Sequence, residues 1–274
     1  MTRPAGNSGS ITSPPGAREE SDVEDAYDRL VSEGNDRLNR PLLPLVATGF
    51  LGGVDVGVGV LIYLVVSHQT GQPLLGAIAF TVGFVALLLA RSELFTENFL
   101  VPVIAVVAKE GSLLQLLRLW LVTLAANLAA GFVMAAMIVV ALPEIRDTAT
   151  EAGAHYAHLG VSWRSFVLAV LGGAVITLLT RMQHSTDSLG VKIVPAVLMS
   201  FVLLGAQLFH SVLDSMLMFA GLLTGDAPFG YLSWLGALGW SAFGNVIGGL
   251  ALVTSIRLLR VPHRVRESRS STSP

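Results

Sequence analysis

Six long apolar segments follow one another from Pro41 onward, and they constrain the fold of this chain more than any other feature. They cover about 41–66, 74–108, 113–142, 163–183, 189–224 and 233–259. Each is near or above the roughly 20 residues that an α-helix needs to cross a bilayer. The sequence therefore predicts an all-α membrane protein, with six transmembrane helices over residues 41–260.

Charged residues are scarce in these segments. Of the 17 Lys or Arg and 19 Asp or Glu, residues 1–40 hold 13 and residues 257–274 hold 6. The chain is 13% charged and 53% hydrophobic, whereas a soluble domain carries roughly a quarter charged residues. The formal net charge of −2 gives no sign of nucleic-acid binding. The absence of cysteine excludes disulfides, thiolate metal sites and cysteine nucleophiles. We predict no catalytic residue, no metal site and no cofactor.

Two terminal segments flank the apolar part. Residues 1–18 are rich in Gly, Ser, Thr and Pro, which predicts a disordered start to the N-terminal segment 1–40. A short amphipathic helix follows and is expected to end near Gly34, with one apolar face made by Val23, Tyr27, Leu30 and Val31. This helix is either a plug or docking element at the cytoplasmic mouth or a solvated leader. Residues 261–274 form a basic tail.

The second and fifth apolar segments are too long for one span, and a polar run interrupts each. The runs are Arg91–Asn98 and His210–Ser215. Backbone leaves the helix at membrane depth only where it is buried in protein or lines a water-accessible cavity. The two runs therefore predict broken helices that mark the functional interior.

Lys and Arg residues predict the orientation of the chain. With both termini in the cytoplasm, 14 of the 17 lie on the cytoplasmic side. Two, Arg146 and Arg164, lie outside, and Arg91 lies at a break. This bias is typical of an even number of spans with both ends inside, and it predicts a multi-pass protein of the cytoplasmic membrane.

The two halves of the apolar part resemble each other. The first and fourth helices carry Gly52-Gly53 and Gly172-Gly173, and the third and sixth carry Asn127-x-x-x-Gly131 and Asn245-x-x-x-Gly249. Because each half has three spans, the second half enters the membrane from the opposite side. The pattern predicts two inverted three-helix repeats, with a pathway between them that the two breaks line.

His210 is the sharpest candidate for chemistry, because it follows an apolar run and a buried imidazole can change charge near neutral pH. We expect Thr96 to meet it across the pathway and orient its ring, and Leu94 and Phe95 to form an apolar constriction. Asp214 is expected to cap the second half-helix by accepting backbone N–H groups.

Other ionisable residues leave alternatives open. Arg91 and Glu93 form either a local charge pair or part of a vestibule, and Asp55 pairs with Arg91, caps a helix end or accepts a proton. The remaining histidines are expected to be solvated. They are His184 and His263 at cytoplasmic ends, and His68, His155 and His158 in outside loops.

Three motifs together resemble the formate/nitrite transporter family over about residues 37–260. They are Glu-Leu-Phe-Thr-x-Asn at 93–98, the His-Ser break at 210–211, and Gly-Asn-x-Ile-Gly-Gly at 244–249. The resemblance implies an aquaporin-like protomer and a homopentamer with one pore in each protomer. It also implies that small monovalent anions such as formate, nitrite or hydrosulfide pass, often with a proton.

The resemblance also assigns residues. His210 matches the central histidine, and Leu94, Phe95 and Thr96 match the family's Ω-loop at the first break, in the motif whose last residue, Asn98, is also expected at the pore. Phe80, Phe84 and Leu203 fall near the family's apolar constrictions, and Thr177 falls where many members have a pore-side asparagine. Three departures resemble a divergent branch: Phe209 replaces an acidic residue, Asp214 replaces an asparagine, and Arg164 is the nearest cation to a vestibule lysine.

These observations predict a transporter for small weak-acid anions, with the anion, a proton and the lipid bilayer as its partners. In this hypothesis the anion accepts a proton at His210 and Thr96 and crosses the apolar constriction as the neutral acid. One alternative is a channel for neutral solutes or ammonium, and another is an intramembrane hydrolase using Ser211 or Ser200. Against the hydrolase, His210 and Ser211 are adjacent and point to different helix faces, and no Gly-x-Ser-x-Gly elbow occurs.

Overall fold

The computed structural model describes residues 15–259 and Pro262, and every regular element within this part is helical. Residues 1–14 of the predicted disordered segment and nearly all of the basic tail lie outside the described residues. Pro15 to Arg18, which the composition assigned to the disordered segment, begin the first helix.

Five stretches of the described chain are long and apolar enough to cross a membrane. They are α2 (Leu42–Thr70), α3 (Pro73–Ala90), α5 (Leu113–Ala141), α7 (Trp163–Gln183) and Tyr231–Thr254, which contains α10 (Tyr231–Ile247) and the π-helix η3 (Gly248–Thr254). Two shorter apolar helices, α8 (Leu189–Gly205) and α9 (Ser211–Leu223), follow each other and together form the fifth span in chain order. The predicted set of six segments is therefore present, and the short helix α11 (Ser255–Leu258) ends the last one.

The second and fifth spans are broken as the sequence predicts. After α3 the chain passes through the 3₁₀ helix η1 (Phe95–Phe99) and continues as α4 (Val101–Val107). After α8 it runs through residues 206–210 into α9. Arg91 and Gln207 open the two breaks with left-handed backbone, at φ 54° and φ 51°.

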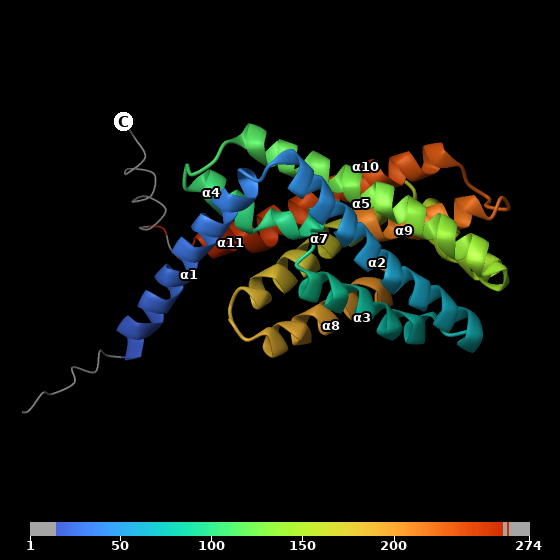
Figure 1. Ribbon diagram of the computed structural model, residues 1–274, viewed down its shortest axis with the longest axis horizontal. Helices are drawn as coiled ribbons and strands as arrows, with labels where there is room; N and C mark the ends of the chain where they lie inside the picture. Colours follow the sequence, from blue (N-terminus) through green and yellow to red (C-terminus); the bar gives the residue numbers. More distant parts are fainter. Residues whose placement is uncertain (1–14, 260–261, 263–274) are drawn as a thin grey trace, which may run out of the picture.

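Helices from the two halves pack against each other around the breaks. Helix α3 contacts α8, and α9 contacts α5, so each broken span lies against the other half. Figure 1 shows these helices side by side in one elongated bundle. The outer surface keeps large apolar side chains exposed, for example Leu43, Leu121 and Val140, as lipid contact requires.

Asn127 of α5 satisfies the backbone at the first break. Its Nδ2 donates to the carbonyl oxygens of Gly49 (2.7 Å) and Glu93 (2.9 Å), and its Oδ1 accepts the N–H of Phe95 at 2.9 Å. The side chain is fully buried. One amide therefore joins the first helix, the broken helix and the third helix of this half.

Asn245 of α10 makes the same three bonds in the second half. Its Nδ2 donates to the carbonyl oxygens of Ala169 (2.8 Å) and Phe209 (2.9 Å), and its Oδ1 accepts the N–H of Ser211 at 3.0 Å. The two sets of bonds place Phe95 and Ser211 at equivalent positions. These equivalent hydrogen bonds support the inverted three-helix repeats directly, since the repeated asparagines bind the same kinds of backbone groups in both halves.

The repeated glycine pairs make room for these bonds. A Cβ at Gly52 would collide with the carbonyl group of Glu93, and a Cβ at Gly172 would collide with that of Phe209. The next glycines, Gly53 and Gly173, lie against the backbone of the two asparagines. Small residues here let the first helix of each half approach the break closely.

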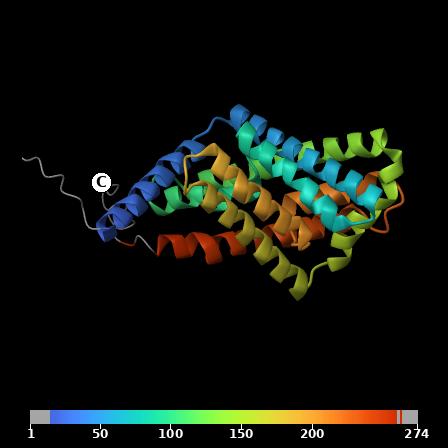
Figure 2. The same ribbon diagram turned by 90° about the horizontal axis from the view of Figure 1, so that it is seen from below.

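Helix α1 (Pro15–Leu38) covers one end of the bundle and runs further than the sequence predicts. It continues past Gly34, because that glycine lies against α4, where a Cβ would be 2.5 Å from the carbonyl oxygen of Val101. Tyr27 and Leu30 are buried against the same helix. Figures 1 and 2 show α1 and α11 at the same end of the bundle.

Helix α6 (Arg146–Leu159) is an element that the sequence reading treated as an outside loop. It follows α5 and the single turn η2 (Pro143–Ile145), and it packs against α9. Its buried residues Ala149, Gly153 and Tyr156 recur at helical spacing along the face that meets α9. Helix α6 is too short and too polar to span a membrane, and it lies against α9 instead.

We predict that Asn127→Ala and Asn245→Ala each lower the apparent Tm of the detergent-solubilised protein strongly. Each change leaves one carbonyl and one N–H group at the break unpaired, at about 1–3 kcal/mol for every buried group that loses its partner, and it also removes a second hydrogen bond to a carbonyl group of the neighbouring helix. The exposed Asn39 supplies the control, and Asn39→Ala is expected to melt close to wild type. Equal melting of Asn127→Ala and Asn39→Ala would contradict this role.

A second prediction concerns the contact between α1 and α4. Gly34→Val is expected to displace α1, since a larger side chain cannot fit against the Val101 carbonyl group. Limited proteolysis should then cut within α1 faster than in wild type. Ser32→Val, on the exposed side of the same helix, is the matched control, and equal protection of the two variants would rule out close packing at Gly34.

Candidate functional site

The two breaks bring Thr96 and His210 together in the middle of the bundle. The Thr96 Oγ1 and His210 Nε2 atoms lie 2.8 Å apart, and both residues are fully buried. This is the contact that the sequence analysis expects between the two halves. Apolar side chains of one buried cluster, among them Leu94, Phe95 and Phe209, adjoin this polar contact in the chain.

The hydrogen bonds of His210 define its ring. His210 is the N-cap of α9, where its Nδ1 accepts the N–H of Leu213 at 3.1 Å. A ring nitrogen that accepts carries no hydrogen, so the neutral ring has its hydrogen on Nε2 and donates it to Thr96 Oγ1. The hydroxyl hydrogen of Thr96 is then free for another acceptor.

Asp214 lies one turn into α9 and reaches back to His210. Its Oδ2 accepts the backbone N–H of His210 at 2.6 Å, so the carboxyl group caps this half-helix as the sequence suggests. Its Oδ1 is buried and has no hydrogen-bond partner. Together the His210 ring and the Asp214 carboxyl group order the start of α9.

The residues expected at the constrictions are all buried and belong to one apolar cluster. That cluster contains Leu94, Phe95, Phe80, Phe84 and Leu203. The Phe80 and Phe84 ring centroids lie 5.7 Å apart. Phe95 packs edge-on against two further rings, those of Phe99 (5.1 Å) and Trp120 (6.4 Å).

Two other expected pore residues make contacts elsewhere. The Thr177 hydroxyl donates to the carbonyl oxygen of Gly173 on its own helix at 2.8 Å. Asn98 accepts a hydrogen bond from Arg37 of α1 at 3.2 Å, and its backbone carbonyl accepts the indole N–H of Trp120 at 2.9 Å. Neither has a hydrogen bond to Thr96 or His210 in the described chain.

Tyr156 of α6 is a buried residue near the site that the sequence analysis missed. Its ring stacks on that of Phe209, the neighbour of His210, with centroids 6.1 Å apart and an interplanar angle of 4°. The signal available in the sequence was the spacing of Ala149, Gly153 and Tyr156. Within a polar stretch, that pattern predicts a helix with one packed face.

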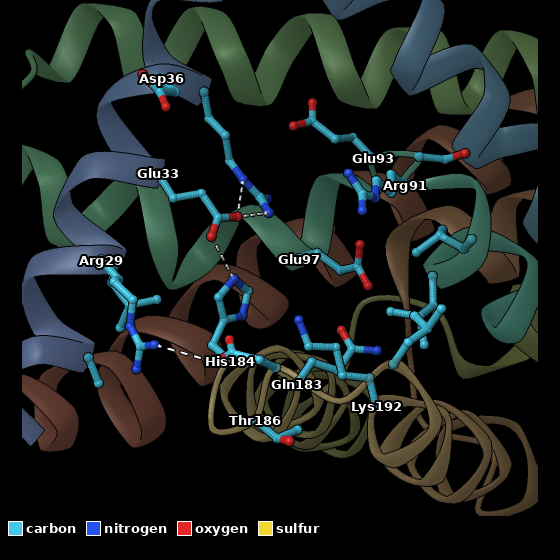
Figure 3. Close-up of a pocket in the computed structure, with 18 of the residues that line it drawn as sticks. Arg29, Glu33, Asp36, Arg91, Glu93, Glu97, Gln183, His184, Thr186 and Lys192 are labelled. Carbon is cyan, nitrogen blue, oxygen red and sulfur yellow. Dashed lines mark hydrogen bonds and ion pairs between the residues drawn. The ribbon is translucent and has the colours of Figure 1, made fainter. Parts of the chain in front are cut away.

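A cavity of about 620 Å³ opens between α1 and the first break. Figure 3 shows Glu33 and His184 on one side of it and Arg91, Glu93 and Glu97 across from them. Glu97 follows Thr96 directly, so the cavity extends to the neighbour of the central site.

Helix α1 is held over this cavity by a charged cluster. The Glu33 carboxylate accepts hydrogen bonds from Arg37 (2.6 Å) and His184 (3.1 Å), so His184 is bound rather than simply solvated. Burial alone would raise the pKa of Glu33, but the His184 hydrogen bond and the Arg37 charge outweigh it and lower the pKa to about 2. Because Arg37 also contacts Asn98, the cluster links α1 to the first break.

The structure resolves the alternatives for Arg91 and Glu93 and removes one of those for Asp55. Glu93 forms an ion pair with Arg40 at 2.8 Å, so it is not the local partner of Arg91; both residues line the cavity and belong to a vestibule. No ion pair joins Asp55 to Arg91 in the described chain, which removes the pairing proposed for Asp55.

Known proteins resemble this chain in sequence and in fold. Residues 24–259 match the sequence profile described as "Formate/nitrite transporter". The "Inner membrane protein YfdC" of Escherichia coli K12 is 27% identical over 243 residues, which is 81% of this chain and 74% of that protein. The "Uncharacterized transporter YrhG" of Bacillus subtilis 168 is 24% identical over 245 residues, covering 84% of this chain and 90% of that protein.

Two solved structures share the fold. An "FNT family ion channel" has a TM-score of 0.73 at 17% identity, with 88% of this chain and 98% of that chain covered. A "Pentameric formate channel with formate bound" has a TM-score of 0.67 at 20% identity, with coverages of 81% and 98%. The profile match spans all of the residues that build the breaks, the repeats and the central contact. The chain therefore belongs to the formate/nitrite transporter family, a family of channels and transporters rather than enzymes.

Proposed function

We propose that this chain transports small monovalent anions of weak acids, such as formate or nitrite, through a pore between its two repeats. The observation that carries the proposal is the buried Thr96–His210 contact, which lies where the two helix breaks meet. Family membership supports an anion of this class.

The vestibule next to α1 supports anion entry. Arg91 and Lys192 line it and take part in no ion pair within the described residues, so each is a local point of attraction for a negative solute. Asp36 and Glu97 also line it without an ion pair in that part of the chain, so the support comes from these two positions and not from a net positive charge. Farther in, the side chains around Thr96 and His210 are apolar, and a bare anion there would lose its hydration without full compensation.

The cost of moving a dehydrated anion through this apolar region is removed if the anion gains a proton at the His210 site. The free hydroxyl hydrogen of Thr96 binds the anion, and a proton delivered at this site converts it to the neutral acid. The neutral acid then passes the apolar cluster at much lower cost than the anion. A channel for neutral solutes or ammonium has the same architecture and is the second candidate.

The proposal also covers the oligomeric state of the chain and its place in the cell. A solved relative is described as a pentameric formate channel, and the exposed apolar surface of this chain suits both lipid and neighbouring protomers. We propose a homopentamer with one pore in each protomer, in the cytoplasmic membrane. The proposal includes cytoplasmic termini: α1 and the end of the last span lie at the same end of the bundle, which supports one common side, and the Lys and Arg bias supports the cytoplasmic one.

His210→Phe is expected to lower formate uptake by proteoliposomes by at least about tenfold, which is the scale of a lost proton-transfer or charge-stabilising group. Thr96→Val should lower it as well, because the hydroxyl group that faces His210 is removed. His68→Phe, at the exposed end of α2, is the control. Parallel assays with nitrite, hydrosulfide, acetate and ammonium separate the two candidates, and unchanged, still pH-dependent flux in His210→Phe would refute the role of His210.

The orientation is tested by cysteine labelling, because the natural chain has no cysteine. Ser188→Cys lies in the loop between α7 and α8 at the α1 end, and Asp226→Cys lies in the loop between α9 and α10 at the other end. A membrane-impermeant maleimide should label Asp226→Cys in intact cells and Ser188→Cys only in inside-out vesicles. The reverse pattern would invert the proposed topology.

A further inference from the structure

The carboxyl group of Asp214 has an oxygen that the fold does not use. The side chain is 2% exposed, and its Oδ2 accepts the His210 N–H at 2.6 Å. Oδ1 is equally buried but meets no hydrogen-bond donor or acceptor in the described chain. A capping role requires one oxygen, so the second needs a separate explanation.

Asp214 also lacks a compensating positive charge. No Lys, Arg or His forms an ion pair with it among the described residues. An isolated carboxylate away from water costs several kcal/mol, and such a group holds a proton instead. The uncharged acid carries its hydrogen on Oδ1, since Oδ2 already accepts a hydrogen bond.

The ionisable groups that face Asp214 do not change this conclusion. His210 caps the same helix, and Tyr156 of α6 is near enough to interact electrostatically with Asp214 and with Tyr63 of α2. None of these supplies a fixed positive charge. The other helices packed on α9 are α5 and α10, whose ionisable residues are Arg118, bound to the Arg40 carbonyl oxygen, and Tyr231, which is exposed.

His210 is poorly placed to release a proton by itself. Its Nδ1 accepts the Leu213 N–H, and its Nε2 hydrogen is bound to Thr96. Giving up that hydrogen from the neutral ring would create an imidazolate, and adding a proton at Nδ1 would break the cap of α9. A carboxylic acid is a far stronger proton donor than a neutral imidazole.

We propose that Asp214 is the group that carries the transported proton, and that His210 and Thr96 position the anion beside it. This inference rests on the proposed function and identifies the proton carrier within the same site. The O–H bond at Asp214 Oδ1 breaks, and a new O–H bond forms on the anion, so formate leaves as formic acid and Asp214 becomes a carboxylate. Asp214 then regains a proton from a hydronium ion in water that enters the pore, and that ion becomes a water molecule.

The first test is independent of transport. Infrared difference spectra of purified wild type and Asp214→Asn at neutral pH should contain a carbonyl stretch of a protonated carboxyl group that the variant lacks. Asp214→Asn keeps an oxygen for the His210 N–H, so the fold is expected to be retained, and equal Tm values would verify this. Asp226→Asn, in an exposed loop, should keep the band. The absence of a band that depends on Asp214 would overturn the proposal.

The second test measures proton movement with formate. In proteoliposomes that contain a pH indicator, inward formate flux through wild type should acidify the lumen beyond the level in protein-free vesicles. Asp214→Asn should lose most of this protein-dependent acidification per formate, whereas Asp226→Asn should not. Wild-type acidification per formate in Asp214→Asn would overturn the proposal.

The two tests separate the two hypotheses. If wild type moves none of the assayed anions, the proposed function fails, and the infrared band still decides whether Asp214 is a protonated acid. If wild type moves formate and the band is missing, the proposed function stands and the assignment to Asp214 is wrong.

Discussion

Polar backbone groups at membrane depth must be paired inside the protein, and the rest of this structure depends on how two asparagines meet that requirement. Asn127 and Asn245 each pair two carbonyl groups and one N–H group at a break. A single side-chain amide suffices because it supplies two donors and an acceptor. Without these amides, the backbone groups at each break would be unpaired, and a continuous helix would have the lower free energy. No site would then lie between the halves.

The breaks determine where chemistry can occur. Because the backbone is not helical at the two breaks, the side chains of Thr96 and His210 face each other instead of facing lipid or packing in the core. The surrounding Phe and Leu side chains make the site apolar, which strengthens each remaining electrostatic interaction. The same burial means that a charge at the site is stable only with an opposite charge beside it or after a proton has neutralised it.

Much of the architecture follows from the sequence, because apolar segments, polar interruptions and repeated Gly and Asn residues are local signals with direct physical causes. The bounds of α2, α5 and α7 lie within a few residues of the expected segments. The Thr96–His210 contact could also be predicted from the sequence, since an inverted repeat brings its two breaks together. The pore roles of Phe80, Phe84, Leu203 and Thr177 remain predictions.

Other features depend on tertiary contacts that one sequence does not reveal. Gly34 is a helix breaker by local propensity, but its missing side chain lets α1 pack on α4, so the helix continues. Glu93 has Arg91 two residues away, yet it pairs with the distant Arg40. Helix α6 is polar and lies between spans, and its role becomes visible only when Tyr156 is seen against Phe209.

The repeats are symmetric in backbone pairing and asymmetric in chemistry. The asparagine bonds make Leu94 the counterpart of His210, because each precedes the residue whose N–H is accepted. Leu94 has no side chain that can cap a helix, and the chain after it forms a 3₁₀ turn before α4 begins. His210 and Asp214 cap α9, which starts as an α-helix at once. The backbone requirement fixes the asparagines and glycines in both halves but leaves the residue at each break free to differ. That freedom lets one half supply an apolar wall and a hydroxyl group while the other supplies the ionisable groups.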